Sequence, residues 1–561
     1  MMKKNFFTID NKMALLIFSF LGASFFFLTT IYGVFNSYSS VPFFDMWDSY
    51  IGFHKDLVFG DSSVWFSQHN EHRIFLSRLI FWLDFRFFNG NNAFLLCINF
   101  FIQCIALFFF SFLVLKLKFS SFQKSVFIAL MTCALFSWRQ AENFTWGFQS
   151  QFFLVYICAF FSFLFLYEAK RKQSDLFLYY AFSFSVMSSL SMSNGVLSFV
   201  VLFLMALFLR MGLIRLMILL ASSILFVVLF FLNYQFPSEH GSIFDEMLHR
   251  PFLMLRYVIR FIGAPVGKGG ADLVGLAFIC FSFLGLVSYL RKDRDKIDYL
   301  VVCFAILLFI GASIFATAGG RLVFGLDQVF APRYMTPVIY AWITIFIIWV
   351  HLLSAKHKKY CFFVFFVFFV FFVFVIILLP KQKHTWKDHS GSIFSKKIAV
   401  LLLKMNLYDS AIVSSIFPFR GSLLQQVQHA DDYNTSVFNE GWMRSFDSFL
   451  LGEAHGLKVR DNACTAEVKA SKTLSESTAV MLSGSLHSQV WRPDFLLVSN
   501  KKGETIGYGI FKTNHARSES EYMGEWVTFI KLDLLKKGDQ FSIYGISDKT
   551  FSCLLMSDLV L

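Results

Sequence analysis

The sequence predicts an α-helical polytopic membrane protein that carries a C-terminal β-sandwich domain outside the cytoplasm. Of its 561 residues, 56% are hydrophobic and only 16% are charged, and the mean hydropathy is +0.60. This composition is typical of membrane proteins. After Pro380 the long apolar runs stop, and short alternating segments separated by turn residues follow, as in a β-sandwich. We therefore expect a transmembrane domain at 1–380, a linker with an amphipathic helix at 381–440, and the sandwich at 441–561.

About eleven segments are apolar and long enough to cross a bilayer, which takes roughly 20 residues of helix. The first, Met13 to Val34, follows Lys3, Lys4 and Lys12 and is not followed by an A-x-A cleavage site. It is therefore expected to be a retained anchor and not a signal peptide. The other segments lie at about 92–115, 124–138, 148–167, 176–190, 195–210, 212–233, 272–290, 298–317, 335–353 and 361–379.

Basic residues fall in alternate loops, which predicts the orientation of the chain. Positive residues favour the cytoplasmic side, so the N-terminus and these loops are expected to be cytoplasmic. The net charge of +13 is then explained by membrane topology and does not require a nucleic-acid partner. The opposite loops, and all residues after Pro380, are expected to face the outside. The basic loops contain Lys116, Lys118 and Lys124; Lys170, Arg171 and Lys172; Arg210 and Arg215; Arg291, Lys292, Arg294 and Lys296; and Lys356, Lys358 and Lys359.

The richest polar stretch lies in the first outer loop, between Pro42 and Arg86. Asp45 and Asp48 are three residues apart, which places both carboxylates on one face if the segment is helical. The run His-Asn-Glu-His-Arg at 69–73 adds acid, base and cation. In so apolar a chain, this concentration of polar residues predicts the catalytic loop of a membrane enzyme.

The other outer loops contribute a second set of polar residues. The loops at 139–147 and 191–194 carry Arg139, Glu142 and Asn194, and the loop at 318–334 carries Arg321, Asp327 and Arg333. The loop at 234–271 contains Arg260 and Lys268, and its part 244–262 has the spacing of an amphipathic helix at the membrane interface.

The distribution of charge favours a surface enzyme over a transporter. Coupled transporters usually need ionisable residues and broken helices near the middle of the membrane, and the predicted spans have almost no charge in their centres. An enzyme acting on a lipid-linked substrate needs an outer carboxylate as base and cations for the lipid phosphate. The histidines at 69 and 72 could share a metal if the segment is helical. No HExxH motif is present and no spacing indicates a metal, so no cofactor is expected.

The layout of the chain resembles the GT-C superfamily of membrane glycosyltransferases. A membrane span, an outer loop that begins with the acidic pair Asp45-Met46-Trp47-Asp48, many further spans and a β-rich outer domain follow one another in the same order. The segments HNEHRI, WGFQ, SNG and Gly320–Tyr334 also resemble bacterial polytopic proteins of O-antigen and other surface-polysaccharide clusters. The acidic motif of the superfamily is usually more compact than D-x-x-D, so both aspartates stay candidates.

The resemblance implies an inverting transferase of the bacterial inner membrane. Its donor would be an undecaprenyl-phosphate sugar, its acceptor a surface polysaccharide or lipid, and its base Asp45 or Asp48. The expected substrate-binding residues are His69, Glu71, His72, Arg73, Arg139, Glu142, Asn194, Arg260, Lys268, Arg321, Asp327 and Arg333, with Arg333 and Arg321 first for the phosphate.

Three alternatives stay open at this point. The first is an O-antigen polymerase or ligase, and the second is a polysaccharide transporter, a flippase or a non-enzymatic membrane scaffold. The third concerns each outer Arg or Lys by itself: its side chain extends (snorkels) to lipid phosphates and does not bind substrate. In the C-terminal domain, Cys464 and Cys553 either form a disulfide, which an oxidising compartment permits, or are separate buried thiols.

Overall fold

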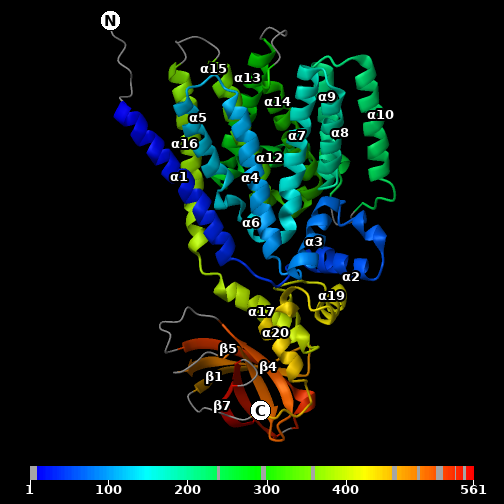
Figure 1. Ribbon diagram of the computed structural model, residues 1–561, viewed down its shortest axis with the longest axis vertical. Helices are drawn as coiled ribbons and strands as arrows, with labels where there is room; N and C mark the ends of the chain where they lie inside the picture. The colour runs from blue at the N-terminus through cyan, green and yellow to red at the C-terminus, as the bar shows by residue number, and fades with distance from the viewer. Residues whose placement is uncertain are drawn as a thin grey trace. The chain divides into compact units, whose positions relative to one another are not determined.

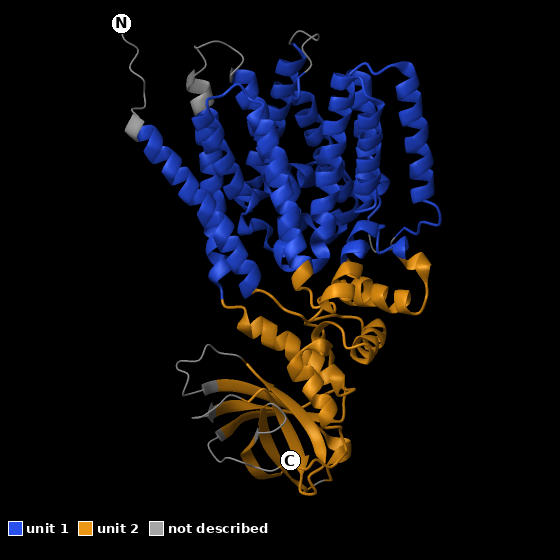
Figure 2. Ribbon diagram, in the orientation of Figure 1, with its two compact units in different colours: residues 1–36, 65–80, 95–387 blue, residues 37–64, 81–94, 388–561 orange. Residues whose placement is uncertain are grey.

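The computed structural model is mostly helical and divides into two compact units (Figure 2). Unit 1 comprises Met1–Asn36, Trp65–Ile80 and Leu95–Lys387, and unit 2 comprises Ser37–Val64, Phe81–Phe94 and Asp388–Leu561. Two parts of the first outer loop therefore belong with the C-terminal part of the chain, a grouping that the predicted division at residue 380 did not contain. The structure describes residues 9–236, 241–291, 298–354, 361–457, 464–488, 493–512, 522–536, 538–547 and 551–560.

Unit 1 is a bundle of long helices around α15 (Met335–Ser354) (Figure 1). α15 is the most buried of its membrane-length helices, with 78% of its apolar window inside the protein, against 17% for α10. The helices of this bundle are α1 (Ile9–Asn36), α4 (Ala93–Leu115), α5 (Ser121–Leu135), α6 (Ala141–Thr145), α7 (Ser150–Lys172), α8 (Asp175–Ser189), α9 (Leu197–Phe208), α10 (Leu213–Phe230), α11 (Ile243–His249), α12 (Pro251–Gly263), α13 (Ala271–Leu290), α14 (Leu300–Arg321), α15 and α16 (Cys361–Gln382), and α3 (Phe75–Phe88) is shared between the units.

All the predicted spans fall on helices, and eight helices within the described part of the chain are long and apolar enough to cross a membrane. The other predicted spans correspond to α5 and α8, with 15 residues each, and α9, with 12. At 1.5 Å per residue these three helices are only about 18–22 Å long, whereas a hydrocarbon core is about 30 Å thick. The sequence correctly predicts apolar helices at these three positions. The helices are, however, shorter than a membrane span requires.

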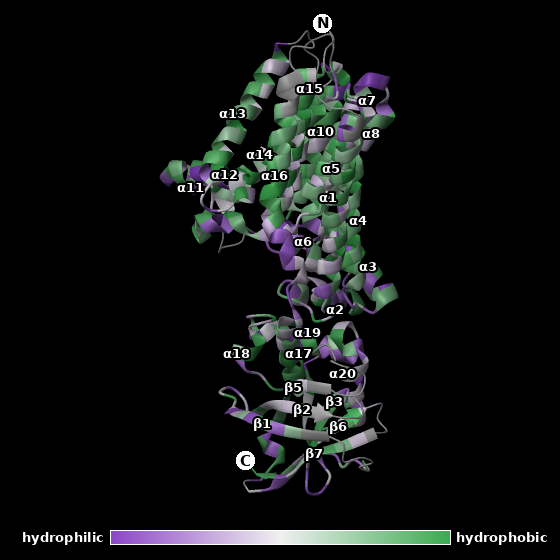
Figure 3. Ribbon diagram, turned by 90° about the vertical axis from the view of Figure 1, so that its left-hand side faces the viewer, coloured by the Kyte–Doolittle hydropathy of each residue, from purple (hydrophilic) through white to green (hydrophobic). Residues whose placement is uncertain are grey.

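The loops of unit 1 gather at two ends of the bundle. At the end with the basic loops, Lys170 Nζ donates to the Arg210 carbonyl over 3.1 Å, and Arg215 pairs with Asp175 over 2.7 Å. Figure 3 shows hydrophobic colour along the middle of the long helices and hydrophilic segments near their ends, such as α6. The basic loops near Lys170 and Arg215 therefore lie together at one end of the bundle.

Unit 2 combines short helices with one antiparallel sheet of seven strands. Its helices are α2 (Gly52–Val58), α17 (Ser390–Lys404), α18 (Ser410–Val413), α19 (Arg420–Asp432) and α20 (Gly441–Ser445). Its strands are β1 (Cys464–Thr473), β2 (Ala479–Ser488), β3 (Phe495–Asn500), β4 (Thr505–Phe511), β5 (Tyr522–Lys531), β6 (Gln540–Ser547) and β7 (Phe551–Val560).

The seven strands run in the order β1-β2-β5-β4-β3-β6-β7, and neighbouring strands are antiparallel. A sandwich would have two sheets, so the predicted β-sandwich is corrected to a single curved sheet, a half-barrel whose edge strands β1 and β7 approach each other. Every residue of the central strand β4 is buried. Both of its faces are therefore covered, and α17 lies against it.

Cys553 is buried and forms a disulfide bond. The side chain of Cys464 lies outside the described residues, so its predicted pairing with Cys553 stays a prediction.

The amphipathic helix predicted within the linker, at 396–416, corresponds to two helices. α17 ends near Asn406, whose backbone is left-handed with φ of 56°, and α18 follows.

Candidate functional site

The run 69–73 forms a tight turn and not a helix. His69 and His72 exchange two backbone hydrogen bonds of 2.8 Å, and Asn70 between them has a positive φ of 47°. Asparagine tolerates this left-handed conformation better than most residues. The expectation that the two histidines share a helix face is therefore wrong, because the chain reverses direction between them.

The turn places Glu71 opposite Arg321, at the end of α14. Nη2 of Arg321 donates to Oε1 of Glu71 over 2.8 Å, and His72 Nε2 lies 3.5 Å from the same oxygen. The Ser193 backbone N–H donates to His72 Nδ1 over 3.3 Å, so the ring proton lies on Nε2, on the side of the carboxylate. Ser193, His72, Glu71 and Arg321 thus form one polar chain that joins three segments distant in the sequence.

A second acid–base pair joins Glu142 of α6 to Arg333. Arg333 Nη1 donates to Glu142 Oε1 over 2.7 Å. Buried amides hold the backbone around the pair, because Asn143 Nδ2 donates to the Arg333 carbonyl over 2.9 Å and Asn99 Nδ2 donates to the Asn143 carbonyl over 3.1 Å. The pair is partly accessible, with 30% of the Arg333 side chain and 21% of the Glu142 side chain exposed.

Tyr257 of α12 lies within electrostatic range of both arginines. It is fully buried, and its hydroxyl has no hydrogen-bond partner within the described part of the chain. Burial raises the pKa of Tyr257, while the positive charges of Arg321 and Arg333 act in the opposite direction. The two ion pairs and this hydroxyl are the candidate site, and they bring α6, α12, the end of α14 and the turn at 69–73 together.

Asn194 also belongs to this region. It lies near Tyr156 of α7, a buried tyrosine that interacts electrostatically with Tyr334, the neighbour of Arg333. His69 packs edge-on against Phe148, with ring centroids 5.3 Å apart. Burial, and then the neighbouring His72 and Arg78, lower the pKa of His69 to about 3, so it is neutral at physiological pH.

Two further predicted cations of the outer loops, Arg260 and Lys268, are also paired with carboxylates. Arg260 binds Asp272 through two contacts, of 2.8 and 3.0 Å, and Arg256 shares the same carboxylate. Lys268 Nζ donates to Asp327 over 2.6 Å at an exposed position.

Arg73 and Arg139 have different surroundings. The three nitrogens of the Arg73 guanidinium donate to the carbonyls of Phe66, Phe230 and Leu232, so this side chain anchors the end of α10. Arg139 makes one long contact, 3.4 Å to the Ile377 carbonyl, and its buried Nε has no partner among the described residues. Burial lowers the pKa of Arg139, which indicates an incompletely compensated charge.

The acidic pair lies in unit 2. Phe44, just before it, has a positive φ of 46° and donates its N–H to the Ile416 carbonyl over 2.8 Å. Asp48 is exposed at the start of a π-helical turn, Trp47–Ile51, whose other side chains are buried. Desolvation by neighbouring groups raises the pKa of Asp48, and the nearby Ser422 and Lys55 act in the opposite direction. The structure therefore holds both aspartates in unit 2 and the other twelve predicted site residues in unit 1.

No group of three metal-ligating side chains gathers within the ranges that the structure describes. The chemistry available in unit 1 is that of carboxylates, a neutral imidazole, guanidinium groups and a tyrosine hydroxyl. This set can bind a phosphate and move a proton.

No family model, no curated protein and no solved structure matches the chain.

Sequence reasoning did not identify Tyr257 and Asp272 as site residues. The four-residue spacing of Arg256 and Arg260 on an amphipathic helix was the available signal for an acidic partner such as Asp272. Tyr257 gave no comparable signal, because a tyrosine in such a helix usually belongs to the membrane interface.

Proposed function

We propose that the chain is a membrane glycosyltransferase. It moves a sugar from an undecaprenyl-phosphate carrier to a surface polysaccharide or lipid acceptor at the outer face of a bacterial inner membrane. The observation that supports this best is the pair of Glu–Arg contacts, Glu71–Arg321 and Glu142–Arg333, whose arginines both lie within electrostatic range of the buried Tyr257. Cations at one end of a membrane bundle suit a phosphate at the end of a lipid carrier.

The arginines would bind the departing phosphate. Each ion pair uses only part of the donor fork of its guanidinium, so further N–H groups are available for phosphate oxygens. Glutamate partners hold the guanidinium groups in place before the substrate arrives, which reduces reorganisation during reaction.

The transfer would be a single displacement at the anomeric carbon. The acceptor hydroxyl forms the new C–O bond as its proton passes to a carboxylate, and the bond from the sugar to the carrier phosphate breaks. Undecaprenyl phosphate leaves, and the anomeric configuration inverts. Asp45 and Asp48 are the proposed bases, and Glu71 and Glu142 are the next candidates. The raised pKa of Asp48 suits a proton acceptor.

The cellular test is the composition of the surface polysaccharide with the gene intact and with the gene deleted. A single-sugar transferase predicts the loss of one sugar substituent while the length of the polymer is retained. Chains shortened to one repeat would instead indicate a polymerase, and loss of all surface polymer would indicate a flippase. An unchanged composition would contradict every transfer reaction at this site.

A further inference from the structure

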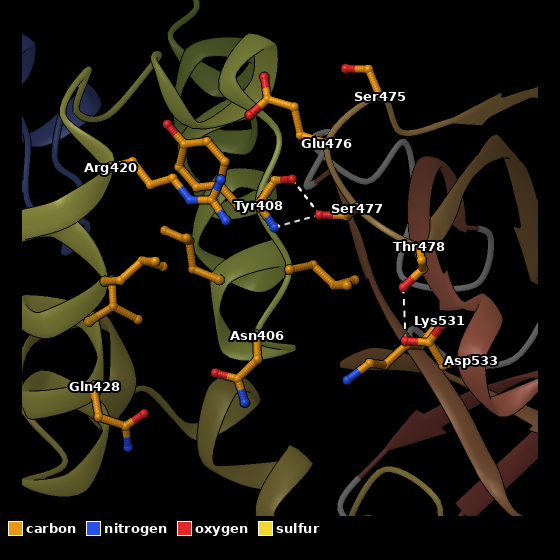
Figure 4. Close-up of a pocket in the computed structure, with 14 residues that line it drawn as sticks. Asn406, Tyr408, Arg420, Gln428, Ser475, Glu476, Ser477, Thr478, Lys531 and Asp533 are labelled. Carbon is orange, nitrogen blue, oxygen red and sulfur yellow. Dashed lines mark hydrogen bonds between the residues drawn. The ribbon is translucent and has the colours of Figure 1, made fainter.

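Unit 2 contains a pocket of about 760 Å³ at the junction of its helices and its sheet (Figure 4). One wall is formed by the end of α17 and by α19, with Asn406, Tyr408, Arg420 and Gln428. The other wall is the loop between β1 and β2, together with Lys531 at the end of β5 and Asp533 just after it. Its volume lies within the range of about 300–1,000 Å³ that is usual for sites of small ligands.

The walls of the pocket are tied to each other. Tyr408 donates its N–H to Ser477 Oγ over 2.9 Å, and the Ser477 hydroxyl donates back to the Tyr408 carbonyl (Figure 4). Asp409 accepts from the N–H and the hydroxyl of Ser475 at 3.2 Å, and Thr478 donates to Asp533 over 2.8 Å. The pocket is therefore pre-formed, which lowers the cost of ordering it around a ligand.

The charges that line the pocket balance. Arg420 and Lys531 contribute two cations, and Glu476 and Asp533 contribute two carboxylates. A phosphate or an acidic ligand would require an excess of cations. The balance favours a ligand without net charge.

The uncharged lining contains many hydrogen-bonding groups beside apolar ones. The amides of Asn406 and Gln428 each offer donors and an acceptor, and serine and threonine hydroxyls lie opposite them. Leucine side chains and the ring of Tyr408 supply apolar contact, with the Arg420 guanidinium 4.6 Å from the ring centroid. Such a lining matches a molecule that has many hydroxyls around an apolar ring face.

We propose that this pocket binds a neutral saccharide. The site lies wholly in unit 2, and the inference does not depend on the transfer reaction proposed above. It gives the C-terminal part of the chain a binding function of its own.

The test is binding of neutral trisaccharides of glucose, galactose, mannose and N-acetylglucosamine to the purified full-length chain, measured by saturation-transfer NMR and calorimetry. The chain is kept in a phosphocholine detergent, since the headgroups of maltoside and glucoside detergents are themselves sugars. Trigalacturonic acid serves as the acidic comparison. At least one neutral trisaccharide should bind at concentrations below about 10 mM.

Two variants remove the amides with little effect on the fold. Asn406→Gly is free of backbone strain, because Asn406 has φ of 56° and glycine adopts this conformation readily. Asn434→Gly is its matched control, with φ of 49° at an exposed position outside the pocket. Gln428→Ala is compared with Gln425→Ala on the same helix, where Gln425 is exposed and does not line the pocket.

Asn406→Gly and Gln428→Ala should each weaken binding by about fivefold or more, the effect of losing hydrogen bonds to the ligand, while both controls bind as the wild type does. Three results would overturn the proposal: no neutral trisaccharide binds, the pocket variants bind like their controls, or the acidic trisaccharide is preferred.

Discussion

At the scale of single residues, four predicted cations of the outer loops, Arg260, Lys268, Arg321 and Arg333, are each held by a carboxylate. Exposed ion pairs of this kind contribute only about 0–1 kcal/mol to stability. At the site, these ion pairs fix the orientation of the cations, because a guanidinium held by a glutamate presents its other donors in one direction.

Arg333→Lys should therefore reduce sugar transfer by roughly ten- to a hundredfold at limiting donor, although the positive charge is retained. The reason is that an ammonium group cannot contact Glu142 and a phosphate with the planar geometry of the guanidinium. Initial rates against donor concentration provide the measurement, with Arg73→Lys as the control for an arginine whose hydrogen bonds go to backbone carbonyls. Full activity of Arg333→Ala at limiting donor would show that Arg333 only snorkels.

Asp84 of unit 2 makes stability depend on pH. It accepts hydrogen bonds from the Tyr50 hydroxyl and the Asn92 N–H, and burial raises its pKa to about 6. The folded chain therefore binds this proton more tightly than the unfolded chain, and stability falls as the pH rises from about 4 to about 6.

Asp84→Asn keeps an acceptor oxygen and removes the charge. We expect it to stabilise the fold at about pH 7.5 by on the order of 2 kcal/mol, and by much less at about pH 4.5. Thermal unfolding of both proteins across this range is the measurement. A difference in melting temperature that is the same at both pH values would show that Asp84 does not titrate in this window.

At the scale of elements, hydrophobicity predicted where helices occur better than how long they are. The predicted spans all lie on helices, because apolar runs of this kind have few alternatives, but α5, α8 and α9 end sooner than a span requires. The short alternating segments expected to form the domain at 441–561 fall on β2 to β7. Their pairing into one sheet could not be predicted, since alternation of residues defines a strand and not its neighbours.

The candidate site shows the same limit. The run 69–73 was recognised by its polarity, yet its turn depends on the left-handed Asn70, and the contacts of Glu71 with Arg321 and of Glu142 with Arg333 join residues 250 and 191 positions apart. Spacing along one helix or strand carries no information about such contacts. The sequence therefore indicated most of the groups, and the fold determines which of them meet.

The close crossing of α12 and α13 depends on two glycines. A Cβ atom on Gly275 would lie 1.8 Å from the Ile259 carbonyl oxygen, and one on Gly263 would lie 1.9 Å from that of Ala271. Gly275→Ala should push the helices apart, weaken the contact of Arg260 with Asp272, and destabilise the protein by about 1–3 kcal/mol. Gly311→Ala on α14 is the control, because no atom lies within 4 Å of its Cβ position. Equal melting temperatures of the two variants in one detergent would refute this packing.

At the scale of the whole molecule, the account requires the basic loops on one side of a membrane and the candidate site on the other. Eight helices of membrane length and the grouping of loops at two ends of unit 1 are compatible with this arrangement. Basic loops favour the cytoplasm, so the chain after Pro380 is expected outside it.

A reporter that is active only in the cytoplasm should therefore be silent when it is fused after Leu561, and active when it is inserted in the basic loop near Lys170. Immunoblots for equal expression make the two comparable. Strong activity of the C-terminal fusion would reverse the orientation and move the candidate site to the cytoplasmic face.

The central claim, transfer of a single sugar from a lipid phosphate, is tested most directly with the purified chain in lipid nanodiscs. Labelled undecaprenyl-phosphate monosaccharides are supplied with acceptor glycolipid from a strain that lacks the gene, and labelled acceptor is measured. Asp45→Asn and Asp48→Asn are compared with Asp56→Asn, an aspartate of α2 to which the account gives no role.

The account predicts transfer by the wild type and by Asp56→Asn, with inversion at the anomeric carbon, and a loss of about 10²–10⁴-fold in at least one of the other two variants. If Asp48 is the base, the rate should begin to fall, on acidification, at a higher pH than an ordinary aspartate would give, because its pKa is raised. No transfer from any single-sugar carrier by a folded wild-type chain would contradict the proposed function, and full activity of both variants would move the base to Glu71 or Glu142.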